Sequence, residues 1–227
     1  MHTQKNYCIR PYMTTALLVY IILLCGLSTG NYAGENTFVT FSKSKENFTL
    51  SDSESTPPIV VHTEDYKGIT RVAGYFKSDL MQVTGINHPT PTGNYQNNKE
   101  IVLIGSLDKN PLIKELVSSG KLKVSDISGT WENSLIAVIN KPFTGVERAL
   151  VLTGSDKRGV MYSVFEISRQ MGVSPWYWWA DVPAKKHSGI YIKTGRYVLG
   201  EPKVKYRGIF LNDEEPALGR WATKFYG

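Results

Sequence analysis

The stretch of this sequence with the strongest potential for chemistry is a polar cluster near its end. Four polar residues follow directly on the apolar run 206–211: Asn212, Asp213, Glu214 and Glu215. The run is typical of a short buried strand, and Pro216 followed by apolar residues at helical spacing predicts a helix. A strand, a carboxylate-rich loop and a helix form one unit of a (β/α)₈ barrel, in which active sites lie at the carboxyl end of the strands.

The elements that would complete such a barrel do not fit into this chain. A barrel takes about 250 residues by itself, whereas only residues 205–227 of the 227 resemble one of its units. We therefore interpret 205–227 as the start of a barrel and the chain as the N-terminal part of a longer protein. The alternative is that this last unit completes a small α/β domain.

Residues 1–30 have the pattern of a secretory signal peptide. Lys5 and Arg10 precede an apolar core at 16–24, and small residues follow. The apolar core is too short to span a bilayer comfortably, so we expect no membrane association after cleavage and a secreted or periplasmic protein. Lipidation of Cys25 is an open alternative, which the bulky Leu24 before it disfavours.

Cysteine content and charge narrow the chemistry further. Cleavage of the signal would remove Cys8 and Cys25, the two cysteines of the chain. Thiolate nucleophiles and cysteine zinc sites are then excluded from the remaining segment, and we predict neither a cofactor nor a metal. The formal net charge is +6, and the signal carries two of the basic residues and no acid. The remaining positive excess is too small to indicate nucleic-acid binding.

Residues 31–185 are predicted to form an N-terminal accessory domain. Short apolar runs predict strands at 59–62, 101–104, 134–139 and 149–152. Helical spacing predicts three helices, which end at Gly85, Gly120 and Gly172. Two β-prone pieces, 37–41 and 48–50, are candidates for a hairpin. This alternation favours an α/β or α+β layered domain.

Two of the predicted helices carry explicit start and face signals. Thr63 and Asp65 are candidate N-caps for the first helix, whose apolar face consists of Ile69, Val72, Ala73, Phe76, Leu80 and Val83. The third helix is expected to bury Val160, Met161, Val164, Phe165 and Met171.

The turn before this third helix partly matches a phosphate-binding loop. Gly154 and Gly159 satisfy the two glycines of a P-loop, but Val160 and Met161 stand where Lys and Ser or Thr are needed. A nucleotide-binding domain is therefore disfavoured. We expect instead that Ser155 or Asp156 caps the helix, with Gly159 allowing close packing.

Four aromatic residues follow one another at 176–179. They favour a packed junction between two domains over a carbohydrate platform, because alternate rings of an extended segment face opposite ways. Residues 186–204 are predicted to be a linker strand, whose many basic residues lie on solvated faces. If some of them line a later pocket, they would suit an anionic substrate.

Three pieces of the sequence together resemble one family. They are Gly-Ser-Asp-Lys-Arg-Gly-Val-Met-Tyr at 154–162, Pro-Trp-Tyr-Trp-Trp-Ala-Asp-Val-Pro at 175–183 and Tyr-Arg-Gly-Ile-Phe-Leu-Asn-Asp-Glu-Glu-Pro at 206–216. They are similar to the N-terminal portion of glycoside hydrolase family 115, the xylan α-1,2-glucuronidases. The resemblance covers residues 35–227 and is strongest after 150.

This resemblance implies an α/β accessory domain followed by a catalytic barrel. It also implies removal of glucuronic acid or its 4-O-methyl ether from glucuronoxylan, a plant cell-wall polysaccharide, with inversion. Inversion needs two carboxyl groups about 6.5 to 9.5 Å apart, which adjacent residues of one strand end cannot supply. Asp213, Glu214 and Glu215 therefore supply at most one member of this pair or a substrate contact, and we expect Asp213, Asn212 and Glu214 to bind substrate.

The main acid and base are expected beyond Gly227, so the chain by itself should be inactive. The alternative is a non-catalytic domain that binds glycan or braces the enzyme. Assembly into a homo-oligomer stays open.

Overall fold

A computed structural model describes residues 37–177, 181–208, 210 and 218–226 of the chain. The chain divides into two units, residues 1–37 and 38–227, and the second is described here. The predicted signal peptide and the predicted substrate-binding residues Asn212, Asp213 and Glu214 lie outside the described residues. Within the described ranges, no helix has the length and apolar character needed to cross a membrane.

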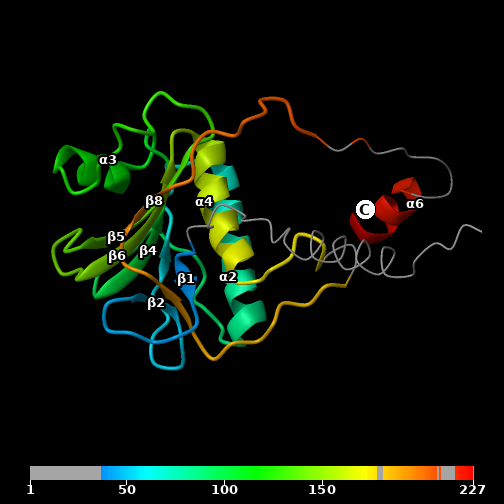
Figure 1. Cartoon of the computed structure of the whole chain (residues 1–227), viewed down its shortest axis with the longest axis horizontal. Helices are drawn as coiled ribbons and strands as arrows, with labels where there is room; N and C mark the ends of the chain where they lie inside the picture. The colour runs from blue at the N-terminus through cyan, green and yellow to red at the C-terminus, as the bar shows by residue number, and fades with distance from the viewer. Residues whose placement is uncertain (1–36, 178–180, 209, 211–217, 227) are drawn as a thin grey trace, which may run out of the picture. The chain divides into compact units, whose positions relative to one another are not determined.

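The larger of two sheets has five strands in the order β3-β4-β6-β5-β8 (Figure 1). β3 (Ile59–Val60), β4 (Glu100–Ile104) and β6 (Arg148–Gly154) are parallel to one another. β5 (Ser134–Asn140) is antiparallel to β6, and β8 (Arg196–Val198) is antiparallel to β5. The strands predicted from apolar runs are therefore confirmed, and the fold is a mixed α/β domain.

The smaller sheet corrects the predicted hairpin. β1 (Val39–Thr40) and β2 (Phe48–Ser51) do not pair with each other, because β7 (Ile190–Ile192) lies between them and is antiparallel to both. All three residues of β7 are buried. A strand from far along the chain thus occupies the place in which a local hairpin partner was expected.

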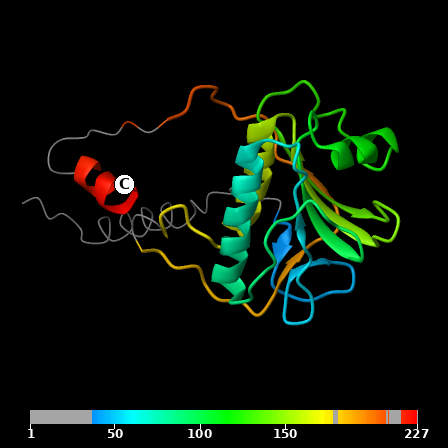
Figure 2. The same cartoon turned by 180° about the vertical axis from the view of Figure 1, so that it is seen from behind.

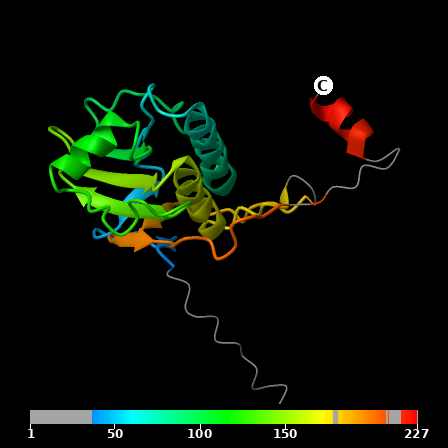
Figure 3. The same cartoon turned by 90° about the horizontal axis from the view of Figure 1, so that it is seen from above.

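Helices cover the two faces of the five-stranded sheet differently. α2 (Lys67–Thr84) and α4 (Lys157–Gln170) pack against each other and against one face, as Figure 2 shows from behind. α3 (Pro111–Ser118) covers the opposite face (Figure 3). Alternate residues of β4 accordingly enter different cores: Val102 faces α2 and α4, whereas Leu103 faces α3. Strands that are buried on both faces of a sheet consist of continuous apolar residues, as β4 and β6 do.

The first predicted helix is confirmed, but its N-cap is not. The expected apolar face of α2 is buried, and Gly85 ends the helix with a φ of 75°. Tyr66 occupies the N-cap position without a side-chain cap. The carboxylate of Asp65, predicted as a cap, accepts instead from Ser106 and Asn110. Hydrogen bonds to a neighbouring turn have replaced the local one.

The helix after the glycine-rich turn begins as predicted. The Asp156 carboxylate accepts from the backbone N–H groups of Arg158 and Gly159 and so caps α4. Val160 and Val164 are buried, but Phe165 is 44% exposed, contrary to its expected place on the buried face. Because Val164 already faces the sheet, the next residue is rotated by about 100° away from it.

The predicted linker strand, 186–204, is not one connecting strand. It contributes β7 to the smaller sheet and β8 to the edge of the larger one, so this part of the chain belongs to the folded domain. Its basic residues are not all free on solvated faces, since the Arg196 guanidinium forms an ion pair with Asp126. Pairing of backbone groups with neighbouring strands explains why the segment folds back.

The unit predicted at 205–227 is only partly visible. Residues 206–208 and 210 form no strand, and Tyr206 and Phe210 are 87% and 90% exposed. Among the described residues no strand pairs with this stretch, and Tyr206 and Phe210 are not buried. The helix predicted after it is present as α6 (Leu218–Tyr226). The barrel itself stays a prediction.

Candidate functional site

The predicted substrate-binding residues lie outside the described part of the chain, but the segment that leads to them does not. Residues 199–207, here called the docked segment, contact the loop 131–134, here called the docking loop. Arg207, the last residue of this segment, lies six positions before Asp213. We therefore build the site from the contacts that hold the docked segment.

The docking loop lies at the carboxyl end of the parallel strands. Ser134 opens β5 and pairs with Gly154, the last residue of β6. The loop then packs against the start of α4, where a Cβ on Gly159 would lie 2.2 Å from the carbonyl oxygen of Asn133. Such a distance leaves no room for any side chain, so Gly159 is needed for close packing, as the sequence predicted.

Hydrogen bonds fix the backbone of the docking loop to the turn between β6 and α4. The Glu132 N–H donates to Asp156 Oδ2 at 2.8 Å, and the Asn133 N–H donates to Ser155 Oγ at 3.0 Å. In return, the Ser155 N–H donates to the Asn133 carbonyl at 2.9 Å. Glu132 has a φ of 50°, a left-handed conformation that costs an ordinary residue about 1 kcal/mol or more. The surrounding bonds hold it there.

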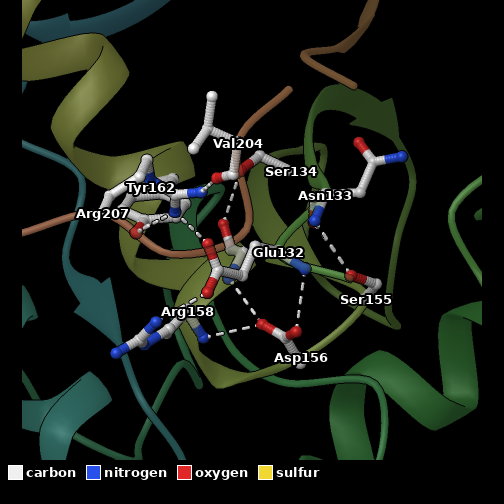
Figure 4. A network of polar contacts seen from close by, with 10 residues as sticks. Glu132, Asn133, Ser134, Ser155, Asp156, Arg158, Tyr162, Val204 and Arg207 are labelled. Atoms are coloured by element: carbon white, nitrogen blue, oxygen red, sulfur yellow. Dashed lines mark hydrogen bonds and ion pairs between the residues drawn. The ribbon is translucent and has the colours of Figure 1, made fainter. Parts of the chain in front are cut away.

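The Glu132 carboxylate binds one arginine with each of its oxygens (Figure 4). Oε1 accepts from Arg158 Nη1 at 2.7 Å, and Oε2 accepts from Arg207 Nη2. Glu132 is only 7% exposed. The hydrogen bonds from Arg158 and then Arg207 lower the pKa of Glu132, and the same bonds raise the pKa of both guanidinium groups. The three side chains are therefore held in their charged forms.

Two aromatic rings enclose the Arg207 guanidinium. Its centre lies 5.6 Å from the ring centroid of Trp131 and 5.9 Å from that of Tyr162. Arg207 Nη2 also donates to the Tyr162 hydroxyl at 3.0 Å, and Nη1 donates to the backbone carbonyl of Val204. Cation–π contacts of this kind add to the ion pair. Arg207 thus connects the docked segment to α4 as well as to the docking loop.

The beginning of the docked segment is held by three hydrogen bonds to the docking loop. The Leu199 N–H donates to the Ser134 carbonyl at 3.1 Å, and the Gly200 N–H donates to Asn133 Oδ1 at 3.0 Å. Glu201 Oε1 accepts from the Trp131 N–H at 2.9 Å. Three consecutive residues therefore follow the docking loop before the chain leaves it.

A second polar cluster lies at the same edge of the sheet, in the turns after β3 and β4. The buried Asp65 carboxylate accepts from the Ser106 N–H at 2.9 Å, from Ser106 Oγ at 2.8 Å and from Asn110 Nδ2 at 3.1 Å. It also accepts from the Tyr66 N–H at 2.8 Å. This carboxylate is fully used in joining two turns, so the cluster is structural.

The described residues at this edge of the sheet do not form a phosphate-binding loop. The amides that open α4 are already bound by Asp156, which agrees with the missing P-loop lysine. Among the residues that the structure describes, no group of three or more His, Cys, Asp or Glu side chains could hold a metal ion.

The aromatic run at 176–179 stays undecided. Trp176 is 60% exposed and Tyr177 is half-buried, whereas Trp178 and Trp179 lie outside the described residues. The junction and the carbohydrate platform both remain predictions.

Sequence reasoning did not find the role of Glu132, because no motif marks it. The residues that surround Glu132 do lie in sequence motifs. Arg158 and Tyr162 belong to the first of the three motif pieces, and Arg207 belongs to the third. The structure brings these two pieces together.

Comparison with known proteins agrees with the motifs. The sequence profile described as Glycosyl hydrolase family 115 matches residues 199–227. Among solved structures, the chain is similar to that reported as a novel family GH115 4-O-methyl-alpha-glucuronidase, BtGH115A, with specificity for decorated arabinogalactans. The identity is 29% and the TM-score 0.60, over 79% of this chain and 22% of that one.

The chain thus spans about a fifth of the length of that relative. A comparison with curated proteins found no significant match. The two matches confirm the resemblance drawn from the motifs, that of the chain to the N-terminal portion of glycoside hydrolase family 115.

Proposed function

We propose that this chain is the N-terminal portion of an exported α-glucuronidase that removes glucuronic acid or its 4-O-methyl ether from glucuronoxylan by inverting hydrolysis. The observation that carries the proposal is the family match at 199–227, which begins at the docked segment and includes Asp213. The α/β domain then serves as the support from which the catalytic segment departs.

In this proposal Asp213, Asn212 and Glu214 bind the uronic acid, and the main acid and base come from a part of the protein beyond residue 227. Inversion requires one carboxylic acid to protonate the leaving oxygen and one carboxylate to activate water. Side chains of adjacent residues on a strand point to opposite faces. Asp213 therefore accepts hydrogen bonds from sugar hydroxyls or orients the water.

A second substrate class deserves a direct comparison. The similar solved structure is of an enzyme with specificity for decorated arabinogalactans. The complete protein should be assayed with glucuronoxylan and with glucuronic acid-decorated arabinogalactan, and the ratio of kcat/KM values decides between them.

The test of the site is Asp213→Ala in the complete protein. Loss of a group that contacts the transition state should lower kcat about a hundredfold or more, as for other preorganised polar groups. If Asp213 only caps the following helix, its loss costs about 0.5 to 2 kcal/mol of stability and leaves turnover near normal. A lowered melting temperature with an intact kcat would remove Asp213 from the site.

The alternative function is a non-catalytic domain that binds glycan or braces the enzyme. The 60% exposed Trp176 favours testing glycan binding, because an exposed indole can stack on a sugar face. Residues 31–227 should release no glucuronic acid by themselves. Retardation of this fragment in a gel containing glucuronoxylan, lost in Trp176→Ala, would support the binding function.

A further inference from the structure

We infer that Glu132 is a positioning residue for the glucuronidase reaction: by joining Arg158 to Arg207, it fixes where the catalytic segment leaves the α/β domain. This inference rests on the proposed function. It concerns a residue that lies in the docking loop and that no sequence motif marks.

The two oxygens of the Glu132 carboxylate have different partners. Arg158 lies in the first turn of α4, whose start is fixed by the Asp156 cap, so Oε1 is tied to the body of the domain. Oε2 is then directed to Arg207, which belongs to the docked segment. The carboxylate thus bridges α4 and the docked segment, so the position of α4 determines where Arg207 is held (Figure 4).

Contacts within the α/β domain hold Glu132 in place independently of its bond to Arg207. Glu132 is 7% exposed, its N–H is held by Asp156, and its φ of 50° fixes the direction of its side chain. The rings of Trp131 and Tyr162 limit the guanidinium of Arg207 from two directions. A side chain that other contacts already hold loses less conformational entropy when it binds a further partner.

Arg207 also binds the domain at the C-terminal end of an exposed stretch, residues 203–206. Glu201 accepts from the Trp131 N–H through its carboxylate, and residues 203–206 after it are exposed, with Tyr206 at 87%. Arg207 then returns to the domain, and Asp213 follows six positions later. Six residues span at most about 20 Å. An anchor at Arg207 therefore restricts the volume that Asp213 can reach, whereas an anchor ending at Glu201 would allow about twice that distance.

The first experiment compares two Glu→Gln variants of the complete protein. Glu132→Gln keeps the shape of the side chain and removes its charge. Glu100→Gln does the same to the Glu100–Arg148 pair, which is half-buried and lies at the opposite end of the parallel strands. We expect kcat/KM to fall between about tenfold and a hundredfold in E132Q, as for groups displaced by about 1 Å. E100Q should keep the wild-type value even where its melting temperature falls.

A double variant separates positioning from general damage. Because E132Q and Arg207→Gln break the same link, E132Q/R207Q should lose no more kcat/KM than the worse single variant. Should E132Q fail to fold, R207Q tests the link from the segment side, since the Arg207 side chain is 36% exposed and lies outside the core.

Limited trypsin digestion tests the anchor without reference to activity. Trypsin cleaves after Lys203, Lys205 and Arg207, and the last of these sites is held in the wild type by Glu132 and Tyr162. Cleavage after Arg207 should accelerate about tenfold or more in E132Q, because cleavage follows the population of the released segment. The rate in E100Q should be unchanged.

The outcomes distinguish the two proposals. Suppose that the complete protein is inactive but that E132Q accelerates trypsin cleavage after Arg207. This result would contradict the proposed function and support the contact between Glu132 and Arg207 as the anchor of the segment. An active protein in which E132Q and R207Q retain kcat/KM within twofold of wild type would overturn the positioning role. Unchanged cleavage after Arg207 in both variants would overturn the anchor itself.

Discussion

Gly159 lies directly against the carbonyl oxygen of Asn133, so that a Cβ at this position would approach the oxygen to 2.2 Å. The contact joins the first turn of α4 to the docking loop. It explains a glycine that superficially resembled part of a phosphate loop: the residue is required for close backbone approach. The turn between β6 and α4 and the loop 131–134 therefore behave as one packed unit.

Gly159→Ala should accordingly destabilise the domain. We expect a loss of about 2 kcal/mol or more, because the backbone must shift to accommodate the methyl group. Gly74→Ala is the matched control, since Gly74 lies inside α2 and a Cβ there would meet nothing within 4 Å. That variant should gain about 0.5 to 1 kcal/mol from the higher helix propensity of Ala. Urea unfolding of both variants checks the pair, and equal midpoints would contradict the packing argument.

The buried carboxylate of Asp65 provides a second test. It accepts four hydrogen bonds from Tyr66, Ser106 and Asn110, and these join the turns after β3 and β4. Asp65→Ala should lower the free energy of unfolding by about 3 kcal/mol, because several buried donors lose their acceptor. Its exposed neighbour serves as the control: Glu64→Ala should change stability by less than about 0.5 kcal/mol. Chemical denaturation measures both values, and similar losses would show that the turns do not depend on Asp65.

Local patterns were sufficient for most elements of the domain. The apolar spacing of α2 and its end at Gly85, the Pro111 start of α3 and the Asp156 cap of α4 all depend on residues within one or two turns of each other. The apolar strands β4, β5 and β6 were found for the same reason, since burial on both faces leaves a continuous apolar run.

Long-range pairing could not be predicted in this way. Nothing in 37–51 indicates that β7 separates β1 from β2, because three buried residues near position 190 fit many partners. Asp65 illustrates the same limit: its local signal favoured a helix cap, but Ser106 and Asn110 bind it instead. Arg207 and Glu132 are 75 positions apart, and the pairing of β8 with β5 in the larger sheet brings their segments together.

The two sheets place the C-terminal boundary of the accessory domain after residue 185. Residues 31–185, the accessory domain expected from the sequence, lack β7 and β8. Because β7 is the central strand of the smaller sheet and is wholly buried, this fragment should not unfold cooperatively. The longer fragment 31–208 contains both strands and the docked segment, and it should unfold cooperatively. Thermal unfolding followed by circular dichroism compares them, and two equally sharp transitions would mean that β7 is dispensable.

His88 should make the domain sensitive to mild acid. The side chain is 1% exposed, its Nε2 lies 2.8 Å from Ser51 Oγ, and its Nδ1 has no hydrogen-bond partner among the described residues. Burial, with a smaller effect of the Lys77 charge, lowers the pKa of His88 from 6.5 to about 4. The folded state therefore resists protonation that the unfolded state accepts.

The sign of the effect follows from this difference. Above the unfolded pKa of 6.5 the stability is complete, and it is lost as the pH falls from 6.5 toward 4, by at most about 3 kcal/mol. His88→Gln, whose amide can still reach Ser51, should flatten this part of the profile. The half-exposed His62 gives the control variant His62→Gln, which should follow the wild type.

The measurement is the free energy of unfolding in urea at intervals between pH 7 and pH 4. Subtracting each variant from the wild type isolates His88 from buried carboxyls such as Asp79, whose pKa burial raises. That carboxyl acts in the opposite direction, because its folded form retains a proton that the unfolded form has lost as the pH rises above 3.8. A difference between wild type and H88Q that stays constant from pH 7 to pH 4 would show that His88 is protonated as readily in the folded domain as in the unfolded chain.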